Sequence, residues 1–544
     1  MSAVATTSMP PELAKAEPWK PKHNKWLVTV SITFGTLMGA IDSSIVNVAL
    51  PHMRGTLGVT LQEITWVSTG YVVAQVLVMP LVAFLGRRFG QKNVYQFCLL
   101  LFVVGSLLCG FARSLEALIA FRVLQGFGAG ALQPTEQAIL RQTFPPAEQG
   151  TAMALFGMAV MIGPAVGPTL GGFIVDHYPW EWIFYINVPV GVLGFLMVSA
   201  FVEEPEDILR ANRVLAERER GHVDYAGIIL LSVGLGALQF VLEEGQDDDW
   251  FESTHITIAA FVAAFSLAFF IWRELTATAP VVAIGLFKDP VFASGTVIGS
   301  LMFAMLMANM FLLPVFMQEM LGFTATQSGL ALMPRTLVMM VATPIVGRLY
   351  RFVSARVLIA IGVMFFSFGA VEMSEFTLDT SASGIVAAIS IQGIGFSLLF
   401  VPLTTVALSQ VPRHRISDAT GMNSLLRQIG GSLGLAIFAT LLSRATTTAS
   451  SSIGAHVDPS RPEVMQRITA AEQMFLGRGY GPDAAHAAAI QSLAGSVAQQ
   501  ATVVAFDQMF LFAGLLFLGV IPLLFFLKAP TPDAAAEPVH VEIE

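Results

Sequence analysis

Charged side chains inside long apolar stretches are the residues most able to do chemistry in this chain. Asp42 stands in the stretch GTLMGAIDSSIVNVALP (35–51), and Arg122 begins the stretch RVLQGFGAG. A charge at the centre of a bilayer costs about 2.5 to 3.5 kcal/mol on insertion scales, so it needs a partner or a use. A buried carboxylate beside a cation can bind and release a proton when their separation changes. We therefore predict that Asp42 carries the proton and that Arg122 is its partner.

The composition places both residues in a membrane. Hydrophobic residues make up 55% of the 544 positions and charged residues 12%, and the mean hydropathy is +0.69. These values are typical of an all-α integral membrane protein with many spans. A spanning helix needs about 17 to 25 apolar residues, and we expect fourteen spans in this sequence. Their approximate limits are 27–50, 62–85, 93–111, 115–143, 150–175, 182–201, 223–243, 255–273, 291–320, 327–350, 356–376, 382–409, 419–443 and 506–527.

The basic residues predict the orientation of the spans. Loops rich in Lys and Arg stay in the cytoplasm, and a cytoplasmic N-terminus places 20 of the 29 basic residues in cytoplasmic loops. The first 25 residues do not resemble a cleavable signal peptide. We therefore expect both termini in the cytoplasm. The net charge of −9 gives no indication of a nucleic-acid partner.

An internal repeat relates the two ends of the chain. The segment LQGFGAG (124–130) returns as IQGIGFS (391–397), 267 residues later. Both copies run in the same direction through the membrane, which indicates two similar halves that move against each other. The six matched pairs at this offset are Gln125 with Gln392, Gly126 with Gly393, Gly128 with Gly395, Pro145 with Pro412, Gly163 with Gly430, and Gly167 with Gly434.

The repeat predicts the domain organisation. We expect an N-terminal six-helix half at 27–201 and a C-terminal six-helix half at 274–527, with two additional helices between them at 223–273. The other predicted parts are a cytoplasmic segment 1–26, a charged cytoplasmic linker 202–222, an external segment 446–505 within the C-terminal half, and a cytoplasmic tail 528–544.

Depth in the membrane allows Asp42 and Arg122 to meet. At 1.5 Å per residue, Asp42 lies about 12 Å and Arg122 about 10 Å below the external end of its span. The offset of 267 takes Asp42 to Asn309 and Arg122 to Ile389, so this pair belongs to the N-terminal half alone. A permanent ion pair that only fastens the first span to the fourth is the alternative.

Glu136 and Arg427 are further charged residues inside predicted spans. Glu136 lies in the cytoplasmic half of the fourth span, where water in an inner vestibule could reach it, and we consider it for proton coupling. Arg427 lies about 12 Å from the cytoplasmic end of its span. We consider Arg427 for substrate binding, although its long side chain could instead extend to the membrane surface.

The ninth predicted span is rich in methionine and phenylalanine. Flexible thioethers and aromatic rings suit a pocket that accepts many shapes, although at helical spacing they also serve as core filler. Trp66 in the second span could likewise be an interfacial anchor. The candidates for substrate contact are Asn47, Trp66, Tyr71, Gln75, Phe303, Asn309, Gln318 and Arg427.

Glycine recurs every four residues in the fifth span. Such a stripe allows another helix backbone to approach closely, and prolines beside it remove backbone donors and bend the helix. We expect a bent, closely packed seam between the two halves, with ordinary small-residue packing as the alternative. The motif comprises Gly157, Gly163, Pro164, Gly167, Pro168, Gly171 and Gly172.

Together these segments resemble the fourteen-span drug/proton antiporters of the major facilitator superfamily, the EmrB/QacA branch. The resemblance covers nearly the whole chain and rests on IDSSIVNVALP, RVLQGFGAG, GMAVMIGPAVGPTLGG, WEWIFYINVPVG, LGFTATQSGLALMP and NSLLRQIGGSLG, in this order. It implies the major facilitator fold and proton-coupled multidrug efflux from a bacterial inner membrane, with no cofactor beyond the proton gradient. The loop LGRRFGQK departs from the family pattern, because Arg87 stands where an aspartate is usual. The gating ion pair that the family forms with that aspartate therefore cannot be inferred for this chain.

The external segment is long for this fold and predicts a helix with small residues on successive turns. It resembles the matching segment of EmrB-type relatives, which work with a periplasmic membrane-fusion subunit and an outer-membrane channel. We therefore expect such partners for residues 446–505, besides small-molecule substrates, protons and the lipid bilayer. A free-standing cap is the alternative.

Other functional classes lack their motifs. The chain has no Gly-Lys pair and no His-Glu pair, which excludes the GxxxxGK[ST] phosphate loop and the HExxH zinc motif. The sequence GGSLG (430–434) fits GxSxG but lies inside a predicted span rather than a strand-to-helix turn. We expect neither enzymatic activity nor a metal site. A channel lacks an obvious filter motif, and an exporter of one physiological metabolite or lipid-like molecule is the main alternative.

Overall fold

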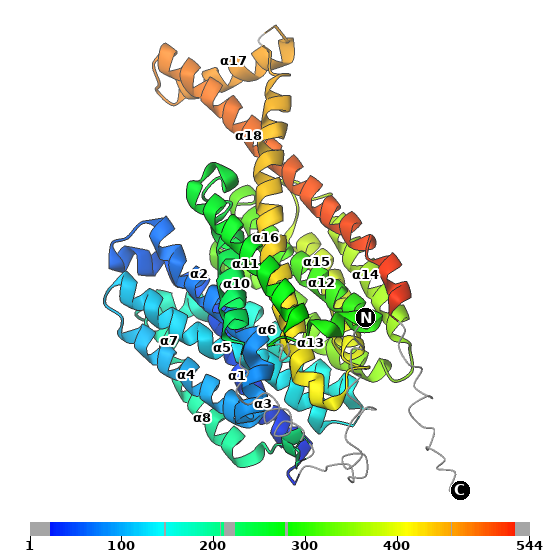
Figure 1. The fold of residues 1–544 in the computed structure, drawn as a ribbon. Coiled ribbons are helices and arrows are strands. Elements are labelled where there is room, and N and C mark those ends of the chain that lie inside the picture. Colours follow the sequence, from blue (N-terminus) through cyan, green and yellow to red (C-terminus); the bar gives the residue numbers. More distant parts are fainter. Residues whose placement is uncertain are drawn as a thin grey trace, which may run out of the picture.

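The computed structural model describes residues 22–145, 148–206, 208–210, 224–277, 281–458 and 460–527. Every regular element among them is helical, and fourteen helices are long and apolar enough to cross a membrane (Figure 1). The prediction of an all-α membrane fold with fourteen spans is confirmed. The predicted segments 1–26, 202–222 and 528–544 lie mostly or wholly outside the described residues.

The N-terminal half contains the first six spans, and polar caps begin several of its helices. Asn24 accepts a hydrogen bond from the backbone N–H of Trp26, and Thr60 forms a capping box with Glu63. The elements are α1 (Lys25–Leu57), α2 (Leu61–Val78), η1 (Met79–Leu81), α3 (Val82–Phe89), α4 (Gln91–Phe111), α5 (Leu115–Thr143), α6 (Gln149–His177), α7 (Trp182–Tyr185) and α8 (Asn187–Phe201).

The C-terminal half contains the last six spans. Asp289 caps its first helix, and Thr324 forms a capping box with Gln327 at the start of the next. The elements are α12 (Pro290–Val315), η5 (Phe316–Met320), which is a π turn, α13 (Ala325–Leu349), α14 (Ala355–Met373), α15 (Ala382–Ala407), η6 (Arg413–Arg415), α16 (Ile416–Gly454), α17 (Pro462–Gly477), α18 (Pro482–Leu518) and η7 (Ile521–Phe526).

Two additional spans, α10 (Tyr225–Glu244) and α11 (Thr254–Thr276), lie between the halves in the chain. α10 packs against α11 and also against α2 and α16. Its Glu244 accepts a hydrogen bond from Thr69 on α2 at 2.7 Å, and its Gln239 donates to Ser432 on α16 at 2.6 Å. α10 therefore joins the two halves. The short elements η3 (Trp250–Glu252) and η4 (Ile284–Lys288) follow α10 and α11.

The close helix contacts repeat in the two halves, but not at one constant offset. A Cβ added to the stripe glycines of α6 or to the matching glycines of α16 would overlap the neighbouring helix, which is α1 or α12. The matched contacts are Gly163 with Ala40, Gly167 with Ser44, Gly430 with Ser300, and Gly434 with Ala304. The first helices of the halves are thus 260 residues apart, whereas α6 and α16 are 267 apart, because the intervening loops differ in length.

This difference corrects one sequence-based match. At an offset of 260, the counterpart of Asp42 is Met302, so the predicted match with Asn309 is wrong. Met302 is buried and uncharged. The conclusion that the C-terminal half lacks a matching carboxylate still holds.

The external segment forms a helical projection beyond the bundle (Figure 1). α16 continues eleven residues past its predicted span limit, to Gly454, and α17 packs against α18. The helix with small residues that was predicted within the external segment is present as the beginning of α18.

Candidate functional site

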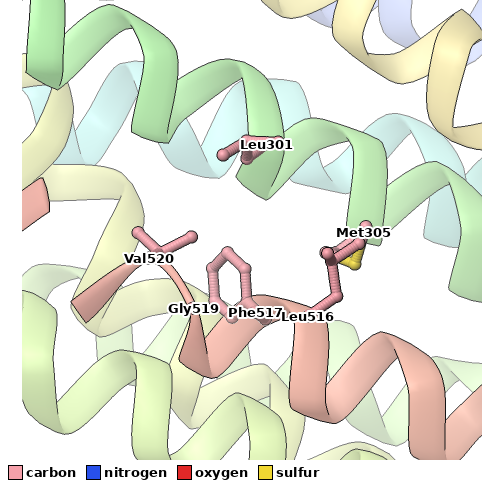
Figure 2. A pocket seen from close by; sticks show the side chains of 6 residues that line it. All are labelled: Leu301, Met305, Leu516, Phe517, Gly519 and Val520. Atoms are coloured by element: carbon pink, nitrogen blue, oxygen red, sulfur yellow. The ribbon is translucent and has the colours of Figure 1, made fainter. Parts of the chain in front are cut away.

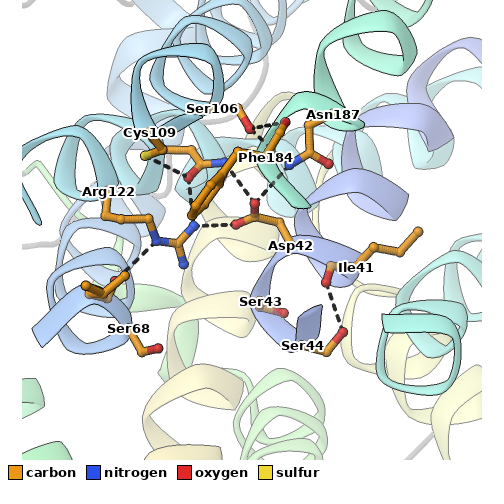
Figure 3. A network of polar contacts seen from close by, with 12 residues as sticks. Ile41, Asp42, Ser43, Ser44, Ser68, Ser106, Cys109, Arg122, Phe184 and Asn187 are labelled. Atoms are coloured by element: carbon orange, nitrogen blue, oxygen red, sulfur yellow. Dashed lines mark hydrogen bonds and ion pairs between the residues drawn. The ribbon is translucent and has the colours of Figure 1, made fainter. Parts of the chain in front are cut away.

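Asp42 and Arg122 form an ion pair in the N-terminal half (Figure 3). One guanidinium nitrogen of Arg122 on α5 lies 2.6 Å from Oδ2 of Asp42 on α1. Arg122 is 1% exposed and Asp42 is 0% exposed. The contact that was predicted from their depth is therefore present.

Three side chains donate hydrogen bonds to the Asp42 carboxylate, so it is well satisfied. Arg122 occupies Oδ2, while Gln125 and Asn187 each donate to Oδ1 at 2.9 Å. Asn187 begins α8, and its amide also donates to Ser106 Oγ on α4 at 3.0 Å. Residues of α5 and α8 therefore bind the carboxylate of α1, and α4 holds Asn187 in place. Neither Gln125 nor Asn187 was singled out as its ligand from the sequence.

The Arg122 side chain is equally well held. Its Nε donates to the backbone carbonyl of Val67 at 3.2 Å, and Nη1, which also contacts Asp42, donates to Gln125 Oε1 at 2.7 Å. Its guanidinium carbon lies 4.0 Å from the ring centre of Tyr71 and 5.6 Å from that of Phe184. Aromatic faces stabilise a buried cation electrostatically.

Tyr71 and Gln75, proposed for substrate contact, are buried on α2 in this conformation. The Tyr71 ring covers Arg122 and is 1% exposed. The backbone carbonyls of both residues face α5 at positions where Gly126 and Gly130 leave room. Tyr71 therefore contacts the Arg122 side chain, and both residues pack against α5, the helix that carries Arg122.

Glu136 is fully buried on α5, about 21 Å along the helix from Arg122. Its Oε1 accepts a hydrogen bond from Thr33 on α1 at 3.1 Å, and its Oε2 has no hydrogen-bond partner among the described residues. The expectation that an inner vestibule solvates Glu136 is wrong for this conformation, because α1 covers the carboxyl group.

Asn47 and Trp66 lie on the exposed side of the N-terminal half. Asn47 accepts a hydrogen bond from Ser68 at 3.2 Å. The Trp66 ring is 41% exposed and stacks on Phe240 of α10, with ring centres 5.5 Å apart. Trp66 therefore contacts an additional span.

Arg427 on α16 lies between aromatic rings of the C-terminal half. Its guanidinium carbon is 5.2 Å from the ring centre of Phe303 on α12 and 5.7 Å from that of Phe400 on α15. The residue is only 4% exposed. Extension of this side chain to the membrane surface, the alternative considered above, is therefore wrong.

Asn309 and Gln318 occupy different environments on the same span. Asn309 is fully buried, and its Oδ1 has no hydrogen-bond partner among the described residues. Gln318 is exposed in the π turn that follows α12. The structure does not bring Gln318 and Asn309 into one contact with Arg427.

α6 lies between the halves as predicted, because it packs against α13 and α15 of the C-terminal half, but its glycine stripe does not face that seam. Gly163, Gly167 and Gly171 face α1, which belongs to the same half. The motif therefore controls the position of the helix that carries Asp42. Pro164 lies inside continuous α6, and Pro168 is half-buried near Gly329 of α13.

The ends of the motif behave differently from its centre. Gly157 faces the Phe400 ring of the other half, whereas a Cβ at Gly172 would meet no atom within 4 Å. Contact between the halves along α6 therefore extends at least from Gly157 to Pro168, on a different face from the glycine stripe.

Hydrogen bonds between the halves gather at the end of the bundle that is rich in basic loops. Arg87 on α3 forms an ion pair with Asp418 on α16 at 2.7 Å, and Gln91 donates to Ser417 at 2.6 Å. Arg141 on α5 donates to the backbone carbonyl of Leu408. The structure is thus closed at this end. The sequence showed that Arg87 departs from the family pattern, but it did not reveal Asp418 as its partner.

An apolar cavity of about 190 Å³ lies away from these charged groups, between α12 and the end of α18 (Figure 2). Its lining is Leu301, Met305, Leu516, Phe517, Gly519 and Val520. Among the residues that the structure describes, no group of three His, Cys, Asp or Glu side chains is arranged to hold a metal ion.

Comparisons with known proteins agree with this architecture. Residues 32–435 match the family model of the Major Facilitator Superfamily. The fatty acid resistance protein FarB of Neisseria gonorrhoeae is 32% identical over 503 residues, 92% of this chain and 96% of FarB. The multidrug export protein EmrB of Escherichia coli K12 is 33% identical over 520 residues, 94% of this chain and 97% of EmrB.

A solved structure supports the fold. The human organic anion transporter MFSD10 (TETRAN) superposes with a TM-score of 0.57 at 13% identity, covering 91% of this chain and all of that chain. The resemblance predicted from the motifs is confirmed. The chain belongs to the Major Facilitator Superfamily, is of the EmrB type, and is a multi-pass membrane transporter rather than an enzyme.

Proposed function

We propose that this chain is a proton-coupled exporter of hydrophobic or amphipathic compounds that works by alternating access. The observation that carries the proposal is the fully buried Asp42–Arg122 pair, whose members come from different spans. Movement of α1 relative to α5 changes their separation and with it the proton affinity of the carboxylate. One charge crossing 100 mV is worth about 2.3 kcal/mol, which is enough to bias the cycle.

Contacts between the halves support alternating access. The closed end is held by a few polar contacts, such as Arg87 with Asp418, while the glycine stripe keeps α1 and α6 together within one half. Each of these hydrogen bonds can be exchanged for one to water at a small net cost once this end opens. The halves can therefore separate at this end, which exposes the surfaces between them to the cytoplasm.

The test is Asp42→Asn in purified protein reconstituted into liposomes with an imposed proton gradient. We expect loss of proton-driven efflux with substrate binding retained, because the amide still accepts and donates hydrogen bonds but cannot ionise. Asp249→Asn in the loop after α10 is the matched control. Normal proton-driven efflux by Asp42→Asn rules out the coupling role and leaves the pair as a fastener.

The substrate range has two candidates. EmrB is a multidrug export protein and FarB is a fatty acid resistance protein. The first relative favours many drugs as substrates, and the second favours a lipid-like class. Efflux of several structurally unrelated dyes, compared with efflux of long-chain fatty acids in the same vesicles, distinguishes them. Transport of fatty acids alone favours the exporter of one physiological class.

We propose that the protein lies in a bacterial inner membrane with both termini in the cytoplasm. We further propose that the external projection is the docking site of a periplasmic membrane-fusion subunit, which is linked to an outer-membrane channel. The exposed, helical character of α17 and the start of α18 supports this role. Deletion of residues 450–490 should abolish resistance in a host with two membranes while vesicle transport persists. Unchanged resistance contradicts the docking role.

A further inference from the structure

Arg427 is a buried cation without an acidic partner. Its Nη2 makes one long hydrogen bond, 3.4 Å to Ser424 Oγ, and its Nη1 has no partner among the described residues. No described Asp or Glu side chain forms an ion pair with it. An unpaired buried charge is costly, so a residue of this kind is retained where a ligand supplies the missing charge.

The surroundings of Arg427 are suited to a ligand with an apolar body. Phe303 and Phe400 present their rings to the guanidinium group from α12 and α15. Gly299 on α12 leaves space beside the arginine, because a Cβ added there would still lie 4.0 Å from its side-chain carbons. A charged donor between aromatic rings can bind an anionic head group while the rings contact the attached chain.

The position also connects this site to the moving parts. Phe400 stacks on Phe156 of α6, with ring centres 6.1 Å apart, and its ring faces Gly157. Arg427 therefore lies one side chain away from the contact between the halves. A ligand that displaces Phe400 would change the packing of α15 against α6.

We propose that Arg427 binds the head group of an anionic amphiphile, with a carboxylate or a similar oxyanion as the recognised group. The guanidinium group matches a carboxylate in charge and planar geometry, and it disfavours cationic amphiphiles by repulsion. This inference rests on the proposed export function and adds a charge preference to it.

Binding of matched probes tests the proposal without any proton gradient. The probes are dansylaminoundecanoic acid and its methyl ester, which share the fluorophore and the chain and differ in charge. Protein in phosphatidylcholine nanodiscs is titrated with each probe, and the signal of empty nanodiscs is subtracted. For Arg427→Gln we expect binding of the acid to weaken by about 10- to 100-fold, the range for losing a hydrogen bond to a charged group. The ester should bind as it does to the wild type.

Two variants serve as controls. Arg427→Lys keeps the charge and should retain most of the preference for the acid. Arg444→Gln removes an exposed arginine from the same helix and should leave binding of both probes unchanged. Equal loss of acid and ester with Arg427→Gln, or no loss of either, overturns the proposal.

Competition in the wild-type protein keeps the proposal testable if Arg427→Gln does not fold. Dodecanoate should displace the acid probe, and dodecyltrimethylammonium should not; displacement by both overturns the charge preference. Nanodiscs that contain phosphatidylglycerol separate the two sources of an anionic head group, since loss of acid binding there assigns the site to a phospholipid instead of a substrate. Failure of proton-driven efflux with these binding results intact would refute the export proposal alone.

Discussion

Two of the buried arginines, Arg122 in the N-terminal half and Arg427 in the C-terminal half, are held in opposite ways. Arg122 has a carboxylate partner, two further acceptors and an aromatic cover, so its charge is balanced within the protein. Arg427 has two aromatic rings and one long hydrogen bond, and no described acid balances it. The same residue type thus serves a closed network in one half and an incomplete one in the other.

The two arginines differ because the charged positions of one half are not repeated in the other. The position of Asp42 is Met302 in the C-terminal half, and that of Arg122 is Ile389. The fold therefore repeats while the charges do not. A self-sufficient pair is suited to exchanging a proton, since a proton and a cation compete for one carboxylate. An unbalanced cation is suited to binding an anion from outside.

The largest expected effect comes from breaking the closed network. Arg122→Gln leaves Asp42 buried without its cation, and removal of one partner of a buried pair costs about 3 to 5 kcal/mol. Chemical or thermal unfolding of the purified protein in detergent measures this loss. The double variant with Asp42→Asn should recover most of the stability, because no unpaired charge remains. A double variant as unstable as Arg122→Gln would show that packing, rather than charge balance, holds the site.

A second test moves the helix that carries Asp42 without touching the network. Gly167→Val would insert a branched side chain against Ser44 and Ile45 of α1, and overpacking of this kind costs about 1 to 3 kcal/mol. We expect impaired or leaky transport, measured as dye efflux and proton leak in liposomes. Gly172→Ala is the control, since a Cβ there meets no neighbour within 4 Å. Normal coupled transport by Gly167→Val would show that α1 and α6 tolerate a wider spacing.

These two sites also show what can be predicted from the sequence. The Asp42–Arg122 contact follows from depth, because helical rise converts residue number into height within each span. Gln125 and Asn187 could not be assigned to the carboxylate in the same way, since their rotation about the helix axes depends on packing. The glycine stripe predicted close packing correctly but not its partner, because a stripe specifies a smooth face and not which helix covers it.

Contacts between the halves were the least predictable. Arg87 and Asp418 are 331 residues apart, and no local pattern relates them. The burial of Arg427 likewise depends on rings from α12 and α15, so its distance from the span end alone could not decide between the two alternatives.

The Arg87–Asp418 pair provides an arginine that is intermediate between Arg122 and Arg427. It is paired but lies at the rim of the bundle, with side chains 11% and 9% exposed. Asp418→Asn should weaken closure at this end by about 1 kcal/mol, which raises the open population about fivefold. Labelling of a cysteine introduced at the buried Thr420, in a background without Cys98 and Cys109, measures this change. The exchanged variant, Arg87→Asp with Asp418→Arg, should again protect the introduced cysteine from labelling. Equal labelling in all variants would show that other contacts keep this end closed.

The smallest expected effect has the opposite sign and is the sharpest test of the comparison. Arg427→Met replaces an unbalanced buried cation with an apolar side chain of similar length, between two rings that also pack well against a thioether. Buried charges replaced by apolar residues often give neutral or higher stability, and we expect a gain of about 1 kcal/mol without ligand. Dodecanoate at about 100 times its dissociation constant should stabilise the wild type by about 2.7 kcal/mol and leave Arg427→Met unchanged. Unfolding in nanodiscs with and without dodecanoate measures both quantities. If Arg427→Met loses as much stability as Arg122→Gln, Arg427 is balanced within the protein after all, and the contrast between the two halves fails.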